Sequence, residues 1–368
     1  MSAGAAPDAA HMRRALELAR RARPSPNPRV GAVVVRDGAI VGEGFHERPG
    51  LPHAEVMALR EAGERARGAD IYITLEPCCH EGRTGPCTEA LCAAGIRRAV
   101  VGMIDPDANV RGGGVATLEE RGIEVSLGIL EAECRRMLEG YVQQRTEGRP
   151  LVRLKAAVSL DGVLAARSGE SKWITGGESR RRAHALRAEA DVVVVGVGTV
   201  LADDPRLTVR DAPGLTPLRL VLDSRLRTPL ESRLVASASL SQPVLIAHAA
   251  DDGARAAELS SRAGVETILC AAGPGGEIDI RDLLERLARR GALSILVEGG
   301  AKVLSSFARQ GLADRFSLFV APKLIGSART WIALPETLDL GGAIPARFDD
   351  AVRLGDDYLL EGAFVREP

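Results

Sequence analysis

Aromatic side chains are scarce in this chain of 368 residues, which has two Trp, three Tyr and six Phe, or 3% of the sequence. Proteins that bind single-stranded nucleic acid stack bases on such side chains, so the scarcity argues against that class. The net charge of −1 also provides no basic surface for a nucleic-acid backbone. We therefore expect no nucleic-acid partner.

Long apolar runs are missing as well. No stretch is long enough to cross a bilayer, and residues 1–14 lack the apolar region of a secretory signal peptide. The six Cys, two of them adjacent, do not resemble a disulfide framework in a chain of this length. We expect a cytoplasmic protein with no membrane partner, and the sequence is compatible with a homo-oligomer.

Helical and strand periodicities alternate along both halves of the chain. A polar stretch with Gly148 and Pro150 interrupts them, and we expect one domain over residues 1–147 and another over residues 150–368. The alternation predicts an α/β architecture in which helices cover a sheet. In the first half we expect helices over 11–23, 54–60, 87–94, 114–121 and 131–141, and strands over 30–35, 39–45, 71–75, 99–103 and 123–127. In the second half we expect strands over 151–158, 192–195, 218–222, 244–247, 265–269, 293–297, 316–320 and 358–365, and helices over 179–188, 283–290 and 302–309.

Two segments of the first half carry candidate metal ligands. His53 is followed two residues later by Glu55, and Cys78 and Cys87 lie nine residues apart. One imidazole and two thiolates form a zinc ligand set whose fourth position is left for water. His-x-Glu with a later Pro-Cys and a further Cys is the signature of zinc-dependent nucleobase deaminases, although most of them space the two Cys more closely. In that chemistry Glu55 would take a proton from the attacking water and deliver protons to the ring nitrogen and the departing ammonia.

Two non-catalytic interpretations stay open at this point. A structural zinc site would be closed by Cys79, His80 or Cys92 as a fourth ligand. Alternatively, the cysteines would be small hydrophobic residues of the core. The structural-zinc interpretation leaves Glu55 without a role.

The motifs resemble those of one known family. The first half contains Pro26-Asn27-Pro28-Arg29-Val30-Gly31, His53-Ala54-Glu55, Leu75-Glu76-Pro77-Cys78 and Gly82-Arg83-Thr84. The second half adds blocks at residues 155–162, 168–175 and 201–210 and the stretch Val297-Glu298-Gly299-Gly300. In this order over residues 10–365, they resemble the bifunctional deaminase–reductases of riboflavin biosynthesis. The chain departs from the family pattern at Cys79, where Ser is expected, and at Gly85, where Pro is expected.

The resemblance implies a cytidine-deaminase-like zinc domain followed by a dihydrofolate-reductase-like domain. It implies hydrolytic deamination of the phosphorylated pyrimidine 2,5-diamino-6-(5-phosphoribosylamino)pyrimidin-4(3H)-one, followed by reduction of the ribosyl chain to ribityl with NADPH. A nucleoside or tRNA deaminase fused to an unrelated reductase is the alternative, and its tRNA version conflicts with the charge and aromatic content.

The resemblance also assigns individual residues. Zn²⁺ is expected at His53, Cys78 and Cys87, with Glu55 as the catalytic residue. The residues expected to hold NADP are Ala157, Trp173, Thr199, Asp203, Ser224, Gly300, Ala301, Lys302, Val303, Leu304, Ser305 and Ser306. Those expected to hold the substrate are Ser171, Arg187, Leu207, Arg210 and Glu298. Gly196-Val197-Gly198 lacks the third Gly of a dinucleotide fingerprint and predicts a tight turn instead.

Overall fold

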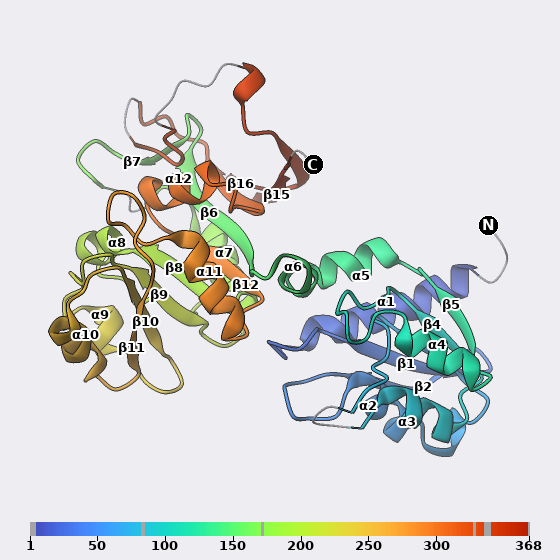
Figure 1. Ribbon diagram of the computed structural model, residues 1–368. Helices are drawn as coiled ribbons and strands as arrows, with labels where there is room; N and C mark the ends of the chain where they lie inside the picture. The colour runs from blue at the N-terminus through green and yellow to red at the C-terminus, as the bar shows by residue number, and fades with distance from the viewer. Residues whose placement is uncertain (1–4, 82–84, 171–172, 327–328, 335–339, 367–368) are drawn as a thin grey trace. The chain divides into compact units, whose positions relative to one another are not determined.

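The computed structural model describes residues 5–81, 85–170, 173–326, 329–334 and 340–366. The chain divides into two compact units, Met1–Arg149 and Pro150–Pro368 (Figure 1). Within the described parts of the chain, no helix combines the length and the apolar character needed to span a bilayer.

The first unit contains a five-stranded sheet in the order β2-β1-β3-β4-β5. The pairs β2–β1 and β1–β3 are antiparallel, whereas β3, β4 and β5 run parallel. The strands are β1 (Gly31–Arg36), β2 (Ala39–Phe45), β3 (Asp70–Ile73), β4 (Arg98–Val101) and β5 (Glu124–Leu127). The helices are α1 (Ala5–Arg21), α2 (Ala54–Ala62), α3 (Cys87–Ala94), α4 (Gly113–Glu120), α5 (Glu131–Met137) and α6 (Glu139–Glu147), with a 3₁₀ turn at Gly63–Ala66.

Two glycines of β2 allow α2 to pack directly on the sheet. A Cβ atom at Gly42 would lie 2.2 Å from the carbonyl oxygen of Ala58, and one at Gly44 would lie 2.2 Å from that of Ala54. No side chain fits in that space, so the helix backbone rests on the strand. This contact fixes the distance of the first turn of α2, and of His53 just before it, from the sheet.

The end of the first unit differs from the sequence prediction. The single helix expected over residues 131–141 is two helices that meet at Leu138, and α6 continues through Glu147 into the stretch expected to be a linker. Gly148, with φ +70°, ends α6 in a left-handed conformation. Tyr141 anchors α6 because its hydroxyl donates to the buried carboxylate of Asp105 at 3.0 Å.

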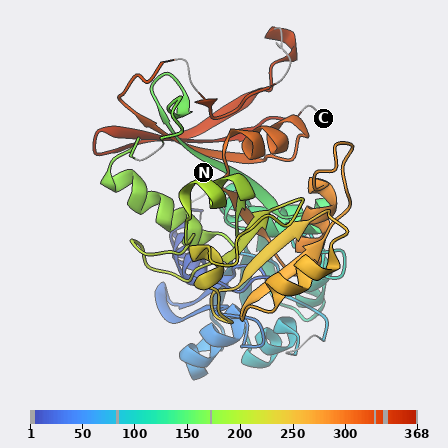
Figure 2. The ribbon, with the colours of Figure 1, turned by 90° about the vertical axis from the view of Figure 1, so that its left-hand side faces the viewer.

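The second unit contains a nine-stranded sheet in the order β11-β10-β9-β8-β12-β6-β13-β16-β15 (Figures 1 and 2). Strands β11 through β13 in this order are parallel, and β16 and β15 complete the sheet in antiparallel pairing. The strands are β6 (Leu151–Ser159), β8 (Val192–Gly196), β9 (Leu218–Leu222), β10 (Val244–His248), β11 (Val265–Leu269), β12 (Ser294–Val297), β13 (Arg315–Ala321), β15 (Ala346–Leu354) and β16 (Asp357–Phe364). A separate two-stranded pair joins β7 (Val163–Ala165) to β14 (Arg329–Thr330).

Helices cover both faces of this sheet. Alternate side chains of the central strands pack with α11 and α12 on one face, and the remaining ones pack with α7, α8, α9 and α10 on the other. The helices are α7 (Gly177–Glu189), α8 (Val197–Asp203), α9 (Arg233–Ala236), α10 (Gly253–Ser260), α11 (Ile280–Arg289) and α12 (Ala301–Arg309), with a 3₁₀ turn at Leu340–Gly342. The strands between the two layers are apolar on both faces, as expected for a parallel sheet.

Several elements of the second unit were not predicted from the sequence. The Gly196-Val197-Gly198 stretch is the start of α8 and not merely a tight turn, because Val197 and Val200 are buried against the sheet. Helix α10 begins at Gly253, and the Asp252 side chain caps it by accepting from the N–H of Arg255. Strand β15 is mostly exposed and is held by pairing with β16, so it carries little hydrophobic pattern.

Candidate functional site

Three metal-ligand side chains meet in the first unit. His53 immediately precedes α2, Cys87 is the first residue of α3, and Cys78 lies in the loop after β3. The Nδ1 atom of His53 is 3.2 Å from Sγ of Cys87 and 3.6 Å from Sγ of Cys78. All three ligand atoms lie within 4.8 Å of one another. The structure therefore brings together the three residues that the sequence predicted as zinc ligands.

The alternative fourth ligands do not join this group. Among the described residues, the cluster of ligand atoms contains His53, Cys78 and Cys87 and does not include Cys79, His80 or Cys92. The sulfur of Cys79 lies against the start of α4, where a Cβ atom at Gly113 would be 2.9 Å from it. The Gly82-Arg83-Thr84 motif lies outside the described residues. Because the sulfur of Cys79 lies at α4 and outside the ligand cluster, this Cys in place of Ser does not compete for the metal position.

The electrostatics of the two thiols fit a cation between them. A hydrogen bond from Cys87 lowers the pKa of Cys78 well below its usual range, and the backbone N–H of Cys87 also donates to its sulfur at 3.4 Å. The interaction with Cys78, together with burial, raises the pKa of Cys87. One thiolate therefore forms readily, but a second one beside it needs a positive ion. Two thiolates around a cation are the donor chemistry of zinc, so these residues fit that metal.

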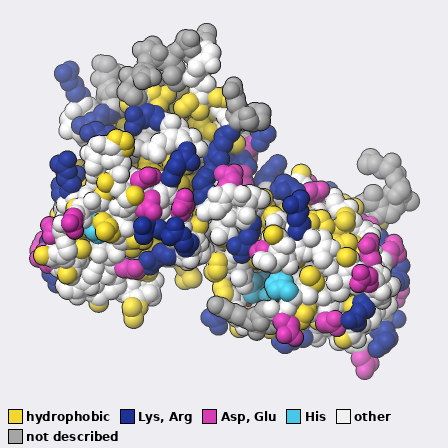
Figure 3. Space-filling view, in the orientation of Figure 1, with side chains coloured by type: hydrophobic (Ala, Val, Ile, Leu, Met, Phe, Trp, Pro, Cys, Tyr) yellow, Lys and Arg dark blue, Asp and Glu magenta, His cyan; other side chains and the backbone are white. Residues whose placement is uncertain are grey.

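Glu55 lies in the first turn of α2, two residues after the His ligand, and only 3% of it is exposed. Burial raises the pKa of Glu55 to about 7, and the nearby sulfur of Cys78 adds to this effect. A carboxyl group that titrates near neutrality can both accept and return a proton. The rings of His46 and His53 make a T-shaped contact, with centroids 5.0 Å apart. His side chains are visible on one face of the first unit (Figure 3).

The second unit contains a buried polar cluster on the face of its sheet covered by α7. Arg187 of α7 donates from Nε and Nη2 to the two carboxylate oxygens of Glu298 at 2.6 and 2.9 Å. Lys155 of β6 places Nζ 3.7 Å from the same carboxylate. Burial raises the pKa of Glu298, but Arg187 and Lys155 outweigh this effect and lower it to about 2. Glu298 is therefore a carboxylate held between two cations.

The loop after α8 joins this cluster. The carbonyl oxygen of Thr208 accepts from Nη1 of Arg187 at 3.2 Å, and its hydroxyl oxygen accepts from Nη1 of Arg210 at 3.3 Å. Leu207 is buried with φ +55°, an uncommon conformation for a side chain of this size. Four predicted substrate residues, Arg187, Leu207, Arg210 and Glu298, thus lie in one connected region. Ser171 lies outside the described residues.

Most predicted cofactor residues lie at the carboxyl ends of neighbouring parallel strands, the edge at which α/β sheets bind ligands. Thr199 and Asp203 belong to α8, which follows β8, and Ser224 follows β9. Gly300 precedes α12 after β12, and Ala157 lies near the end of β6. In the segment from Gly300 to Ser306, Leu304 and Ser305 are buried inside the unit, so the first turn of α12 is the part open to a ligand.

Close packing brings the start of α12 to the end of β8. A Cβ atom at Gly299 would lie 2.6 Å from Cβ of Val303, and one at Gly196 would lie 2.8 Å from Cγ2 of the same Val. The N-cap residue of α12 is Gly300, which has no side chain to cap the helix and at which an added Cβ would meet open space. Backbone N–H groups at an uncapped helix start bind phosphate, so this turn fits a nucleotide cofactor.

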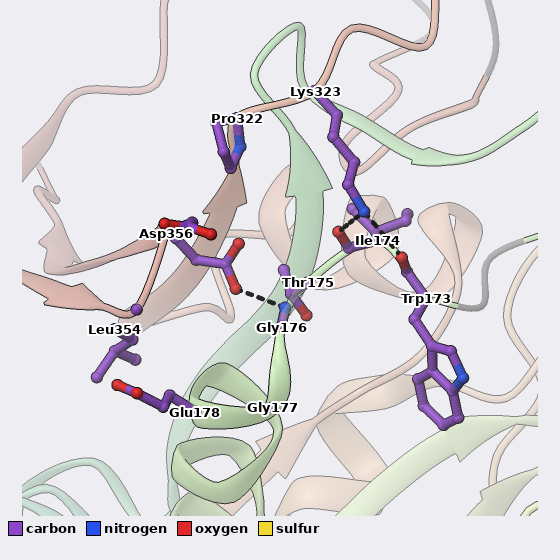
Figure 4. Close-up of a pocket in the computed structure, with 12 residues that line it drawn as sticks. Trp173, Ile174, Thr175, Gly176, Gly177, Glu178, Pro322, Lys323, Leu354 and Asp356 are labelled. Carbon is purple, nitrogen blue, oxygen red and sulfur yellow. Dashed lines mark hydrogen bonds between the residues drawn. The ribbon is translucent and has the colours of Figure 1, made fainter.

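Trp173 lies beside a cavity of about 420 Å³ formed with the end of β13 and the turn between β15 and β16 (Figure 4). Nζ of Lys323 donates to the carbonyl oxygens of Trp173 and Ile174 at 3.2 and 2.9 Å. The carboxylate of Asp357 accepts from the N–H of Gly176 at 2.7 Å. The sequence prediction missed Lys323 and Asp357, because each acts on a segment more than 100 residues away in the chain.

The His/Cys/Cys group of the first unit is that of a zinc-dependent deaminase, and the second unit is a mostly parallel sheet covered by helices on both faces, so the chain is a two-domain α/β enzyme. The family model of the cytidine and deoxycytidylate deaminase zinc-binding region matches residues 6–103, and the RibD C-terminal domain model matches residues 150–360. The chain belongs to the RibD family of bifunctional deaminase–reductases of riboflavin biosynthesis. This confirms the predicted fold class, both enzyme activities and their pathway.

Relatives match along nearly the whole chain. The riboflavin biosynthesis protein RibD of Escherichia coli (strain K12) is 40% identical over 96% of this chain and 98% of its own. That of Aquifex aeolicus is 44% identical over 87% of this chain and 88% of its own. The solved structure of Acinetobacter baumannii RibD, form 1, has a TM-score of 0.88 at 37% identity and covers 98% of this chain and 100% of its own. The solved diaminohydroxyphosphoribosylaminopyrimidine deaminase/5-amino-6-(5-phosphoribosylamino)uracil reductase of Thermotoga maritima has a TM-score of 0.87 at 34% identity, covering 98% and 99%. Since these relatives span both units, a fusion to an unrelated reductase is excluded.

Proposed function

We propose that residues 1–147 deaminate 2,5-diamino-6-(5-phosphoribosylamino)pyrimidin-4(3H)-one and that residues 150–368 reduce the ribosyl chain of the product with NADPH. The observation that carries the proposal is the group of His53, Cys78 and Cys87 beside the buried Glu55. The name of the Thermotoga maritima relative, a diaminohydroxyphosphoribosylaminopyrimidine deaminase, supports the choice of substrate. The near-neutral net charge supports a cytoplasmic enzyme of small molecules, without a nucleic-acid or membrane partner.

In the first unit, zinc held by the His and the two Cys side chains would supply the Lewis acid that lowers the pKa of water. Glu55 takes the proton of the attacking water, because its own pKa of about 7 makes it a base at neutral pH. It then returns protons to the ring nitrogen and to the departing ammonia. Its burial keeps bulk water from exchanging these protons.

In the second unit, NADPH would supply the hydride, the carbon of the open-chain imine of the ribosylamine would accept it, and the imine nitrogen would take a proton from water. The first turn of α12 binds a cofactor phosphate through its backbone N–H groups. Glu298, held as a carboxylate by Arg187 and Lys155, accepts hydrogen bonds from ribosyl hydroxyl groups. The exposed Arg210 pairs with the phosphate of the substrate.

The deciding experiment replaces Glu55 by Gln and supplies either the diamino substrate or the already deaminated one, with NADPH. Gln keeps the shape of Glu but cannot accept the proton, and positioned acid–base groups contribute about 10²- to 10⁴-fold. We expect no NADPH oxidation from the diamino substrate and near-normal oxidation from the deaminated one. Glu89→Gln is the matched control, because its side chain in α3 is 56% exposed and its pair with Arg121 lies at the surface.

Wild-type rates with both substrates in the Glu55→Gln protein would contradict the role of this carboxylate. Loss of both reactions in a folded, zinc-loaded variant would contradict the assignment of one activity to each unit. Activity of the unmodified enzyme on cytidine but not on the diaminopyrimidine would contradict the proposed substrate.

A further inference from the structure

A second buried carboxylate stands next to the metal-ligand loop. Glu76 is 3% exposed and lies two residues before Cys78. Its Oε2 accepts from the N–H groups of Asp105 and Gly112 at 3.1 and 3.0 Å, and its Oε1 accepts from the N–H of Val115 at 3.0 Å. Three backbone donors thus converge on one side chain that the proposed chemistry does not use.

These donors belong to the loop after β4 and to the start of α4. Gly112 is the residue that caps α4, with φ +78°, and Val115 lies in the first turn of the helix. N–H groups at these positions have no partner inside the helix, and a negative charge there is favourable. No side chain of α4 itself caps the helix. Glu76 therefore supplies the cap from a different segment of the chain.

The same contact presses α4 against the residues that lead to the metal ligand. A Cβ atom at Gly114 would lie 2.0 Å from the carbonyl oxygen of Pro77, so the helix backbone rests directly on that residue. The N–H of Glu76 donates to the carbonyl oxygen of Met103 at 2.9 Å. The segment from Glu76 to Cys79 is thereby held at both its backbone and its side chain.

We propose that Glu76 is a positioning residue for the deaminase: by tying α4 and the loop before it to the Glu76–Cys79 segment, it sets the position of Cys78 at the metal site. This inference rests on the proposed zinc site. A carboxylate has two acceptor oxygens, and all three donors need them. Replacement by Gln turns one acceptor into an NH₂ donor, which then faces at least one backbone N–H. The tether is lost on that side while the shape of the side chain is kept.

The test measures metal binding by the full-length protein. Zinc affinity is determined by competition with a chromophoric chelator, and the geometry of the site by the absorption spectrum of the Co²⁺-substituted protein. For Glu76→Gln we expect about 10- to 100-fold weaker zinc binding, the range for residues that orient metal ligands, and an altered Co²⁺ spectrum. Reduction of the already deaminated substrate should stay at the wild-type rate, because that reaction is assigned to the second unit.

Asp105→Asn is the matched control. It alters a buried carboxylate in the same loop, whose oxygens accept from the N–H of Asp107 and the hydroxyl of Tyr141, and it leaves the N–H that reaches Glu76 intact. We expect its zinc affinity and Co²⁺ spectrum to match the wild type. Glu76→Asp serves as a second variant in case Glu76→Gln fails to fold. It keeps both acceptor oxygens on a shorter side chain, so its zinc affinity should be intermediate.

Wild-type zinc affinity in both Glu76 variants would overturn the inference, as would an equal loss in Asp105→Asn, because the effect would then not pass through the Glu76 tether. Failure of the unmodified protein to bind zinc would instead refute the proposed function. The two failures are therefore distinguished by the wild-type measurement.

Discussion

Glu298→Gln should destabilise the second unit by about 3 kcal/mol near pH 7. The Glu298 side chain is 7% exposed and lies between Arg187 and Lys155. Its pKa lies at about 2 rather than 4.5, and this difference corresponds to about 3 kcal/mol of stabilisation of the charged form.

The loss of a buried ion pair corresponds to a similar change in the free energy of unfolding. Removing one partner of a buried ion pair costs about 3–5 kcal/mol, because the remaining charge is left unpaired. Burial lowers the pKa of Lys155. Lys155 can therefore lose its proton once Glu298 is gone, which relieves part of the penalty. Arg187 cannot do so, and its unpaired guanidinium accounts for the loss that remains.

Equilibrium urea unfolding followed by Trp fluorescence measures this change selectively, because the only two Trp of the sequence, Trp173 and Trp331, lie in the second unit. Glu285→Gln is the control, since its side chain in α11 is 61% exposed and its pair with Arg289 is a surface contact. The control should change the free energy of unfolding by less than about 1 kcal/mol.

The difference in the free energy of unfolding between wild type and Glu298→Gln should depend on pH with a definite sign. A carboxyl whose pKa is lowered on folding stabilises the protein above its unfolded pKa and loses this contribution as the pH falls toward the folded pKa. The difference between wild type and Glu298→Gln should therefore be full above pH 4.5 and shrink as the pH falls toward 2. A difference below about 1 kcal/mol near pH 7, or one that grows in acid, would contradict the stabilising role of the charged Glu298.

Three further predictions concern single side chains. Cys87→Ser should lose zinc by elemental analysis, because a hydroxyl is a poor substitute for a thiolate, whereas Cys79→Ser should retain it; the reverse would mean that the wrong thiol was chosen. Burial raises the pKa of Asp105 to about 6, so its charged form is disfavoured in the folded state. Asp105→Asn should therefore stabilise the first unit near pH 7 by at most about 3 kcal/mol. Thermal unfolding followed by circular dichroism should show this gain disappearing below pH 3.8, where the carboxyl is protonated in both states; an equal gain in acid would contradict it. Arg219 is fully buried and donates to the carbonyl oxygen of Arg206, which directly precedes the predicted substrate residue Leu207. Arg219→Met should therefore raise the KM of the reduction more than it lowers kcat, and an unchanged KM in steady-state kinetics would argue against this role.

Local patterns account for the elements that were predicted well. The helix over residues 87–94 and the strands over 218–222 and 265–269 have the predicted bounds, because each is a short periodic run between clear breakers. The predictions are wrong where tertiary contacts decide whether a segment forms a helix or a strand. Helix α8 forms at a Gly-rich turn because it is packed against the sheet, and β15 is a strand because β16 pairs with it.

The metal ligands could be predicted from the sequence because their chemistry is local. His53 and Glu55 are two residues apart at one helix start, and Cys78 and Cys87 flank one loop. Donor type and spacing are sufficient to indicate zinc and a proton carrier. The full-length family resemblance then extended the prediction to the second unit.

The partners of the buried charges were decided only by the tertiary structure. Arg187 and Glu298 are 111 residues apart, Glu76 receives N–H donors from 29 to 39 residues away, and neither contact leaves a periodic trace in the sequence. Tertiary contacts also set the pKa values of Glu55 and Glu298 apart. The Glu55 carboxyl is buried near a sulfur, whereas the Glu298 carboxyl lies between two cations. Residue type and spacing determine which chemistry a side chain can perform, but burial and long-range contacts determine its charge, because desolvation and Coulomb interactions depend on distances in space and not along the chain.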